Sequence, residues 1–234
     1  LRYAYRSPNG EWTTETVPAC APAENCLADT DDYGEFGDIV EIAGLPRIVF
    51  YDRALGDLKL AARDGDDSWT VLTLDGRDPE SGADLGDGGR FASVALDAKL
   101  RLAVAYYDHT QGALRYLPPD GSSAPVVVDD GLYWDESTGA RRNHPVGQHV
   151  HLRFGDTGEA HMLYLDGGQL AMKRAMVTGG NVLGSYLLGD LAAGTYIGFE
   201  VRGQGTLIGA YGAWGKDGNL STHLERFTIE VEPR

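Results

Sequence analysis

Residues 130–151 gather most of the side chains in this sequence that could bind or transform a ligand. The segment reads DGLYWDESTGARRNHPVGQHVH and contains three of the six histidines. Aromatic rings offer contact area at low entropic cost, and the charged groups beside them can hydrogen-bond a sugar or a partner protein. Two further candidates come from turns expected at the same end of the fold. The predicted ligand-binding residues are Tyr133, Trp134, Asp135, Glu136, Arg141, Arg142, His109 and Trp214.

The histidines of this segment could instead hold a transition metal. His149 and His151 are two residues apart at the start of an expected strand, so their rings would face the same way. His144 would be a third ligand, and Asp38, which aligns with His151, would supply an oxygen. Ligands of this kind suit Zn or Cu. The alternative is that these histidines are hydrogen-bonded to water or to backbone carbonyl groups.

A second candidate metal site is the acidic segment DTDDYGEFGD, residues 29–38. Clustered carboxylates suit calcium, which takes about six to eight oxygen ligands. The spacing of an EF-hand loop is missing, and a chain with 35 acidic residues will contain such clusters by chance. The predicted calcium ligands are Asp29, Asp31, Asp32 and Glu35.

Catalysis is the alternative to simple binding in residues 130–151. The candidate groups of a hydrolase or lyase would be Asp135, Glu136, Arg141 and His149. The separation of two carboxylates, which distinguishes glycosidase mechanisms, cannot be derived from sequence. No G-x-S-x-G motif supports a nucleophilic serine. A binding module without catalytic activity is therefore favoured.

Composition narrows the fold and the partners. The 234 residues include 32 glycines, 10 prolines and 12 tyrosines, which favours short strands joined by many turns. A net charge of −15 argues against a nucleic-acid partner, because phosphate backbones need clustered Lys and Arg. No apolar run resembles a membrane span. The G-K-[ST] sequence of a phosphate loop is missing, so we expect no nucleotide cofactor.

The two cysteines, Cys20 and Cys26, lie in the segment CAPAENC. A pair this close in a turn-rich, acidic chain is typical of a loop disulfide formed in an oxidising compartment. A free or metal-binding pair would need further ligands nearby. We therefore expect a disulfide and a secreted protein, extracellular or periplasmic.

An internal repeat positions these candidate residues. Residues 45–76 match residues 101–131 and, more loosely, residues 160–189 and 206–233. Each copy predicts four short strands, of which the second is almost entirely apolar, as expected for a strand covered on both faces. Such four-stranded sheets at a nearly constant period predict an all-β fold, a β-propeller of antiparallel blades; the alternative is a β-sandwich. The leucines that open the third strands are Leu1, Leu58, Leu114, Leu170 and Leu220.

The repeats resemble those of bacterial β-propeller proteins, in which YYD, L-x-Y-A and a tryptophan recur. The matching residues are Asp108 in AYYD, the segment GALRY, and Trp69. The turns SPNGEW and DGDDSW also loosely resemble the Asp-box of sialidases, with Asp64 and Trp69 at the corresponding separation, although the rest of that box is missing. This resemblance implies a fold and no particular activity. Trp12 and Trp69 recur at the repeat period, which predicts that both pack between blades.

Aligned on the repeat, residues 1–17 are the outer half of a blade. Four full blades follow within a single domain, residues 1–234, at about 36–76, 90–131, 147–189 and 194–234. The start at Leu1 suggests processing or truncation. We expect the C-terminal part of a longer propeller, in which a companion segment or chain supplies the missing inner strands. The alternative is a five-bladed ring with one incomplete blade.

The loops that enter the blades, residues 18–35, 77–90 and 130–147, are long and are expected at one end of the fold. Loops on a rigid scaffold commonly carry function, so this end is the expected binding surface. The sequence therefore predicts an extracellular or periplasmic β-propeller that binds a carbohydrate or a protein there. A hydrolase or lyase and a His-based metal-binding protein are the alternatives.

Overall fold

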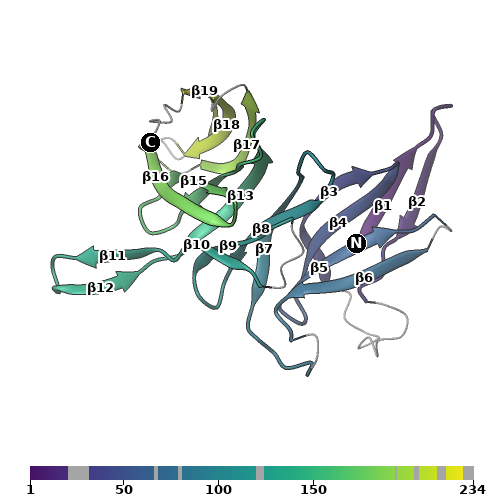
Figure 1. Ribbon diagram of the computed structural model, residues 1–234, viewed down its shortest axis with the longest axis horizontal. Helices are drawn as coiled ribbons and strands as arrows, with labels where there is room; N and C mark the ends of the chain where they lie inside the picture. The colour runs from purple at the N-terminus through teal and green to yellow at the C-terminus, as the bar shows by residue number, and fades with distance from the viewer. Residues whose placement is uncertain are drawn as a thin grey trace. The chain divides into compact units, whose positions relative to one another are not determined.

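The computed structural model describes residues 1–20, 32–65, 68–78, 81–119, 124–192, 194–202, 206–214 and 220–228. They divide into two compact units, residues 1–89 and 90–234, which we describe separately. Strands dominate both units (Figure 1). None of the described elements is a helix long and apolar enough to cross a membrane.

Unit 1 contains a two-stranded and a four-stranded antiparallel sheet. The first consists of β1 (Arg2–Arg6) and β2 (Trp12–Thr16), drawn in purple in Figure 1. The second has the sequential order β3 (Tyr33–Ile42), β4 (Leu45–Asp52), β5 (Asp57–Arg63) and β6 (Trp69–Asp75). Chain neighbours therefore pair throughout, as in the blades predicted from the repeat.

Unit 2 contains two further four-stranded sheets of the same sequential order. The first has β7 (Gly88–Leu96), which begins at the boundary of the units, then β8 (Leu102–Asp108), β9 (Ala113–Leu117) and β10 (Val126–Asp129). The second has β13 (Val146–Phe154), β14 (Ala160–Asp166), β15 (Ala171–Thr178) and β16 (Asn181–Ala192). The predicted all-β fold is therefore confirmed: four-stranded antiparallel sheets follow a two-stranded half blade along the chain.

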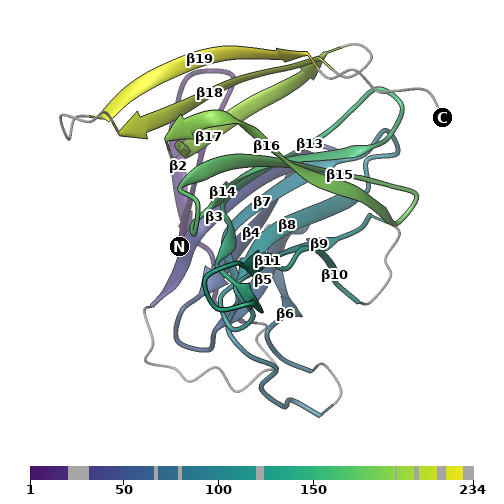
Figure 2. The same cartoon turned by 90° about the vertical axis from the view of Figure 1, so that its left-hand side faces the viewer.

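The last sheet has three described strands, which lie side by side in Figure 2. They are β17 (Gly194–Arg202), β18 (Thr206–Trp214) and β19 (Leu220–Thr228). The fourth strand was expected in FTIEVEP, residues 227–233. Phe227 and Thr228 instead end β19, and the rest of that segment lies outside the described residues.

The second strands are buried, as their sequences predicted. Every residue of β14 is buried, and so is every residue of β8 after Leu102. In unit 2 one apolar cluster joins the first two sheets face to face, with Tyr116 from one sheet and Met162 and Tyr164 from the other. The β7–β10 and β13–β16 sheets thus pack face to face, and this packing positions the turns that join their strands.

Three glycines at or near the start of a first strand each approach a leucine closely. Gly34, Gly89 and Gly147 each begin or nearly begin a first strand and have φ values of 94°, 107° and 104°. A Cβ on any of them would come within 2.7–2.8 Å of a leucine of the same unit. Because only glycine allows this approach and this backbone conformation, the contact repeats. The leucines are Leu1, Leu58 and Leu114 in turn.

The β14–β15 ladder corrects the sequence alignment in the next repeat. Leu170 was expected to open the third strand, but it precedes β15 and is 59% exposed. In the ladder, Asp166 pairs with Ala171 as Asp108 pairs with Ala113, so Met172 takes the place of Leu114. Met172 is 1% exposed. The prediction of Leu170 was wrong because a methionine fills the position and a leucine happens to lie two residues earlier.

The half blade packs on the first full sheet through the core of unit 1. Val17 and Trp69 lie in one buried cluster, against which Leu1 and Tyr3 pack. The Tyr3 ring meets the Trp69 ring edge-on at 5.7 Å. The hydroxyl of Tyr33 donates a hydrogen bond to the Val17 carbonyl, at 3.0 Å. Leu1 occupies the contact made by Leu58 and Leu114 elsewhere, so β1 and β2 correspond to a third and a fourth strand.

The two repeat-period tryptophans have different environments. Trp12 pairs with Arg6 as Trp69 pairs with Arg63, so their positions in the sheets are equivalent. Trp69 is 8% exposed, as predicted, whereas Trp12 is 66% exposed. The prediction that Trp12 packs between blades was wrong, because no described element of unit 1 covers it as Tyr3 covers Trp69.

Candidate functional site

The segment that concentrates the predicted binding residues forms a β-hairpin. Strand β11 (Leu132–Asp135) pairs with β12 (Ala140–Asn143), and Figure 1 shows the pair extending away from the sheets of unit 2. At its base the His144 amide donates to the Gly131 carbonyl, at 3.2 Å. The Gly131 amide donates to Asp129 Oδ1, at 3.0 Å. The base of the hairpin is therefore fixed next to the end of β10. Its tip extends away from the sheets and can meet a ligand.

Asp135 organises the tip of the hairpin. Its carboxylate accepts hydrogen bonds from the Ser137 amide at 3.0 Å and from the Thr138 hydroxyl at 2.8 Å. The Arg142 guanidinium lies 3.0 Å from it. The bonds from Ser137 and Thr138 lower the pKa of Asp135 below its ordinary value. A carboxylate held ionised in this way positions the turn and is poorly suited to donate a proton.

The aromatic residues of the hairpin face in opposite directions. Tyr133 pairs with Arg142 and Trp134 with Arg141, and side chains alternate between the two faces of a strand. The Tyr133 ring stacks on the His144 imidazole, with 4.9 Å between ring centres. Trp134 lies on the other face and is 61% exposed. Arg141 and Glu136 are also exposed.

A buried network of charged groups lies beneath the Tyr133 ring. His144 Nε2 is 2.9 Å from Asp166 Oδ1, and the Lys173 ammonium is 3.7 Å from Asp166 Oδ2. The same ammonium contacts Asp129 Oδ2 at 2.5 Å, and the Tyr164 hydroxyl donates to that oxygen at 2.7 Å. Satisfied networks of this kind rigidify the surrounding structure. The base of the hairpin is therefore fixed by side chains as well as by backbone.

The hydrogen bonds of this network decide the charge of Asp129. Burial by itself raises its pKa, but the hydrogen bonds from Lys173 and Tyr164 outweigh burial, so the pKa is lowered. Asp129 is therefore ionised at neutral pH and paired with Lys173.

One pair of this network recurs in each of the three described four-stranded sheets. An aspartate ends the second strand, and a cation on the third strand lies seven residues later. Each aspartate also accepts a hydrogen bond from a backbone amide of the turn that follows, which is a structural role. The pairs are Asp52 with Lys59 at 3.4 Å, Asp108 with Arg115 at 2.8 Å, and Asp166 with Lys173. The constant spacing was visible in the sequence, but sequence reasoning did not use it.

Unit 1 holds a buried carboxyl group of a different kind. Asp57 is fully buried, with Arg77 at 3.4 Å and Lys59 at 4.0 Å. Burial raises the pKa of Asp57, and the nearby cations only partly oppose that effect. A raised pKa suits a general acid, but a fully buried side chain cannot contact a substrate.

The two histidines proposed as a metal pair contact different strands. His149 lies where the β13 ladder shifts register, with φ of 53°, and its ring is 4.4 Å from that of Phe91 on β7. His151 instead meets Phe199 on β17, at 5.6 Å. Burial lowers the pKa of His149. The register shift interrupts the alternation on which the prediction of a shared face depended.

The position of His149 could have been recognised in the sequence from its spacing after a glycine. Phe36 and Phe91 also follow a first-strand glycine by two residues and have φ values of 53° and 54°. His149 therefore occupies a recurring aromatic position of the fold. Among the described residues, which include all the predicted histidine ligands, no three His, Cys, Asp or Glu side chains are grouped to hold a metal.

The remaining candidates lie elsewhere. Asp32 and Glu35 both approach Arg53, at 3.7 and 3.5 Å. Asp38 in unit 1 accepts a hydrogen bond from the Ile39 amide, and His109 contacts the Tyr107 ring. The side chain of Trp214 on β18 and residues Asp29, Asp31 and Cys26 lie outside what the structure describes. The calcium and transition-metal sites and the Cys20–Cys26 disulfide stay predictions.

Comparison of the sequence with family models and with curated proteins finds no match. The structure is similar to that of the α-L-arabinofuranosidase PaAbf62A from Podospora anserina in complex with cellotriose. The TM-score is 0.54 at 16% identity, over 88% of this chain and 68% of that one. This similarity confirms the β-propeller fold.

Two further glycoside hydrolases resemble the chain more distantly. One is the catalytic domain of the Coprinopsis cinerea GH62 α-L-arabinofuranosidase, with a TM-score of 0.46, 12% identity, and 92% and 70% of the two chains covered. The other is the GH43 endo-arabinanase from Bacillus licheniformis, with a TM-score of 0.42, 11% identity, and 83% and 73% covered.

Proposed function

We propose that the protein binds carbohydrate on the exposed face of the β11–β12 hairpin. The observation that carries the proposal is Trp134, which is 61% exposed on a hairpin whose base is fixed by hydrogen bonds. An aromatic ring held at the surface can stack on the apolar face of a sugar without losing much conformational freedom. The fold shared with an arabinofuranosidase whose structure contains cellotriose supports this choice of ligand.

The groups around Trp134 suit sugar hydroxyls. Arg141 lies directly across the hairpin from Trp134, and its guanidinium offers up to about five hydrogen-bond donors. Glu136, exposed at the tip, offers acceptors. A small number of precisely placed polar groups beside an aromatic surface is typical of a site for a small ligand. The ligand class is therefore a neutral oligosaccharide.

Trp134→Ala is expected to weaken oligosaccharide binding at least about tenfold, because truncating a central aromatic contact typically costs more than about 1–2 kcal/mol. Isothermal titration calorimetry with cellotriose and with arabino-oligosaccharides measures the change. The matched control is Trp12→Ala, which removes an equally exposed tryptophan from unit 1. Equal affinities of Trp134→Ala and the wild-type protein would refute the proposal, and so would the failure of every oligosaccharide to bind the wild type.

Glycoside hydrolysis is the second candidate, favoured by the fold of PaAbf62A. The turn groups around Asp135 hold its pKa low, so this carboxylate is poorly suited to act as the general acid, which needs a raised pKa. Our first proposal predicts binding without release of reducing sugar from arabinan or 4-nitrophenyl arabinofuranoside. Release by the wild-type protein that Glu136→Gln abolishes would establish hydrolysis instead.

A further inference from the structure

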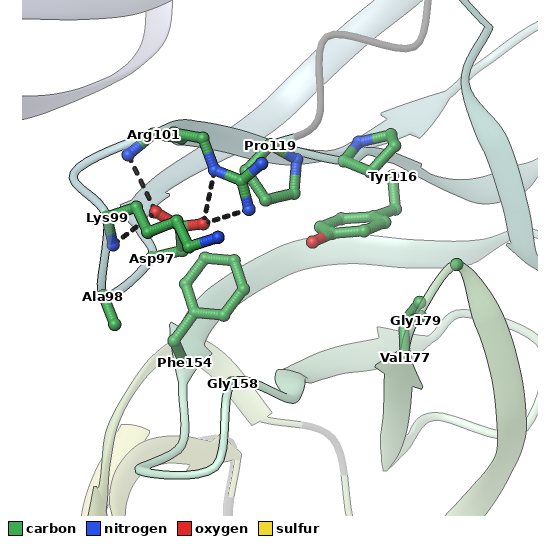
Figure 3. Close-up of a pocket in the computed structure, with 12 residues that line it drawn as sticks. Asp97, Ala98, Lys99, Arg101, Tyr116, Pro119, Phe154, Gly158, Val177 and Gly179 are labelled. Atoms are coloured by element: carbon green, nitrogen blue, oxygen red, sulfur yellow. Dashed lines mark hydrogen bonds and ion pairs between the residues drawn. The ribbon is translucent and has the colours of Figure 1, made fainter.

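A pocket of about 340 Å³ lies in unit 2 at the opposite end of the sheets from the hairpin. It is formed where the β7–β8 and β13–β14 turns approach the ends of β9 and β15, so two stacked sheets contribute to it (Figure 3). Its volume falls within the range of small-molecule sites. None of the predicted binding residues lines it. The lining includes Lys99, Arg101, Tyr116, Pro119, Phe154 and Val177.

The walls of the pocket are largely apolar. Tyr116 and Val177 belong to the core cluster of unit 2, and Phe154 packs against that cluster. Pro118 and Pro119 complete this wall. These rings are rigidly held because the sheets behind them are closely packed. A flat ligand ring could contact Phe154 and Tyr116 without any rearrangement of the core.

Three glycines form part of the pocket lining. Gly158, Gly179 and Gly180 line it, and a Cβ at any of them would meet nothing within 4 Å. All three have positive φ, as their turns require. A side chain at any of these positions would therefore extend into open space.

Three charged side chains line the pocket, and two of them pair with each other. Asp97 accepts hydrogen bonds from the backbone amides of Lys99 and Arg101, at 2.9 and 2.8 Å. The Arg101 guanidinium pairs with the same carboxylate at 2.6 Å, shown by the dashed lines in Figure 3. Asp97 and Arg101 thus neutralise each other. The ammonium of Lys99 makes no ion pair within the described residues, so the lining carries a net positive charge in a chain of net charge −15.

We propose that this pocket binds a small aromatic carboxylate. The ring would contact Phe154 and Tyr116, and the carboxylate would pair with Lys99. A phosphate dianion would need more donors than one ammonium and would leave the apolar wall uncovered. This proposal is independent of carbohydrate binding at the hairpin.

The test uses 4-hydroxybenzoate as the probe, with 4-hydroxybenzamide as its neutral counterpart and inorganic phosphate as the anion without a ring. We expect the whole chain to bind 4-hydroxybenzoate more tightly than either. Lys99→Gln should weaken that binding about tenfold, since it removes the charge that pairs with the carboxylate. Binding of the benzamide should not change. Titration followed by NMR gives all the affinities.

Arg6→Gln is the matched control, because it removes an exposed cation from unit 1. Unchanged binding by Arg6→Gln alongside the loss in Lys99→Gln supports the proposal. It is overturned if the acid and the amide bind equally, if Lys99→Gln binds 4-hydroxybenzoate as the wild type does, or if phosphate binds as tightly as the aromatic acid. If Trp134→Ala loses oligosaccharide binding but still binds 4-hydroxybenzoate, the pocket and the hairpin are independent sites.

Discussion

Lys173→Met is expected to lower the free energy of unfolding of the β13–β16 sheet by about 3–5 kcal/mol. Its ammonium lies 2.5 Å from Asp129 and 3.7 Å from Asp166, and these side chains are only 8% and 1% exposed. Methionine fills a similar volume but leaves two buried carboxylates without their cation. The cost of an uncompensated buried charge, and not the loss of packing, dominates the expected effect.

The effect of Lys173→Met should depend on pH. The hydrogen bonds of Lys173 and Tyr164 overcome the effect of burial and lower the folded-state pKa of Asp129. Since the unfolded-state pKa is about 3.9, this stabilisation is present above about pH 4 and is lost as the pH falls through the folded-state pKa. The difference between Lys173→Met and the wild type should therefore be largest at neutral pH and should narrow in acid.

Amide hydrogen exchange in β14 and β15 measures this change locally, which matters because two units need not unfold together. Arg202→Gln is the control, because its pair with Glu200 is 67% and 68% exposed and should contribute less than about 1 kcal/mol. Adding Asp129→Asn to Lys173→Met should restore part of the loss. Equal effects of Lys173→Met and Arg202→Gln would show that the network does not stabilise the fold.

Trp69→Ala is expected to cost about 3–5 kcal/mol in unit 1, as truncation of a large core aromatic side chain usually does. Trp69 is 8% exposed and contacts Tyr3 edge-on, so its loss opens a cavity between the half blade and the first full sheet. Exchange protection should fall in β1 and β2 as well as in β5 and β6, because the ring joins the two sheets.

Trp12→Ala provides the comparison for Trp69→Ala at an equivalent sheet position. Trp12 is 66% exposed, so its replacement should change stability by no more than about 0.5 kcal/mol. A loss in Trp12→Ala comparable with that in Trp69→Ala would contradict the packing described for unit 1.

The repeat was sufficient to predict the sheets, because each copy contains the same apolar second strand and the same turns. It was insufficient to place individual residues where one copy departs from the others. The prediction fell on Leu170 because leucine fills the first three equivalent positions. Only the backbone ladder, in which Asp166 pairs with Ala171, identifies the buried residue.

The candidate site was predicted less well than the fold. Residues 130–147 contained the exposed aromatic residue, but their hairpin and its opposite faces depend on the pairing of Trp134 with Arg141. His149 and His151 were expected to share a face because strands alternate, and a shift in the ladder removed that regularity. The pocket around Phe154 was not predicted, since its walls come from turns far apart in the sequence.

The closed base of the hairpin has a consequence for engineering. The amide of His144 and the carbonyl of Gly131 are joined by a hydrogen bond of 3.2 Å, so the chain leaves the sheets and returns to them at one point. Insertions between two points already held together cost little additional closure entropy as they lengthen. The residues between Gly131 and His144 can therefore be exchanged for other sequences while the sheets keep their path, which makes this hairpin a site for grafting new recognition loops.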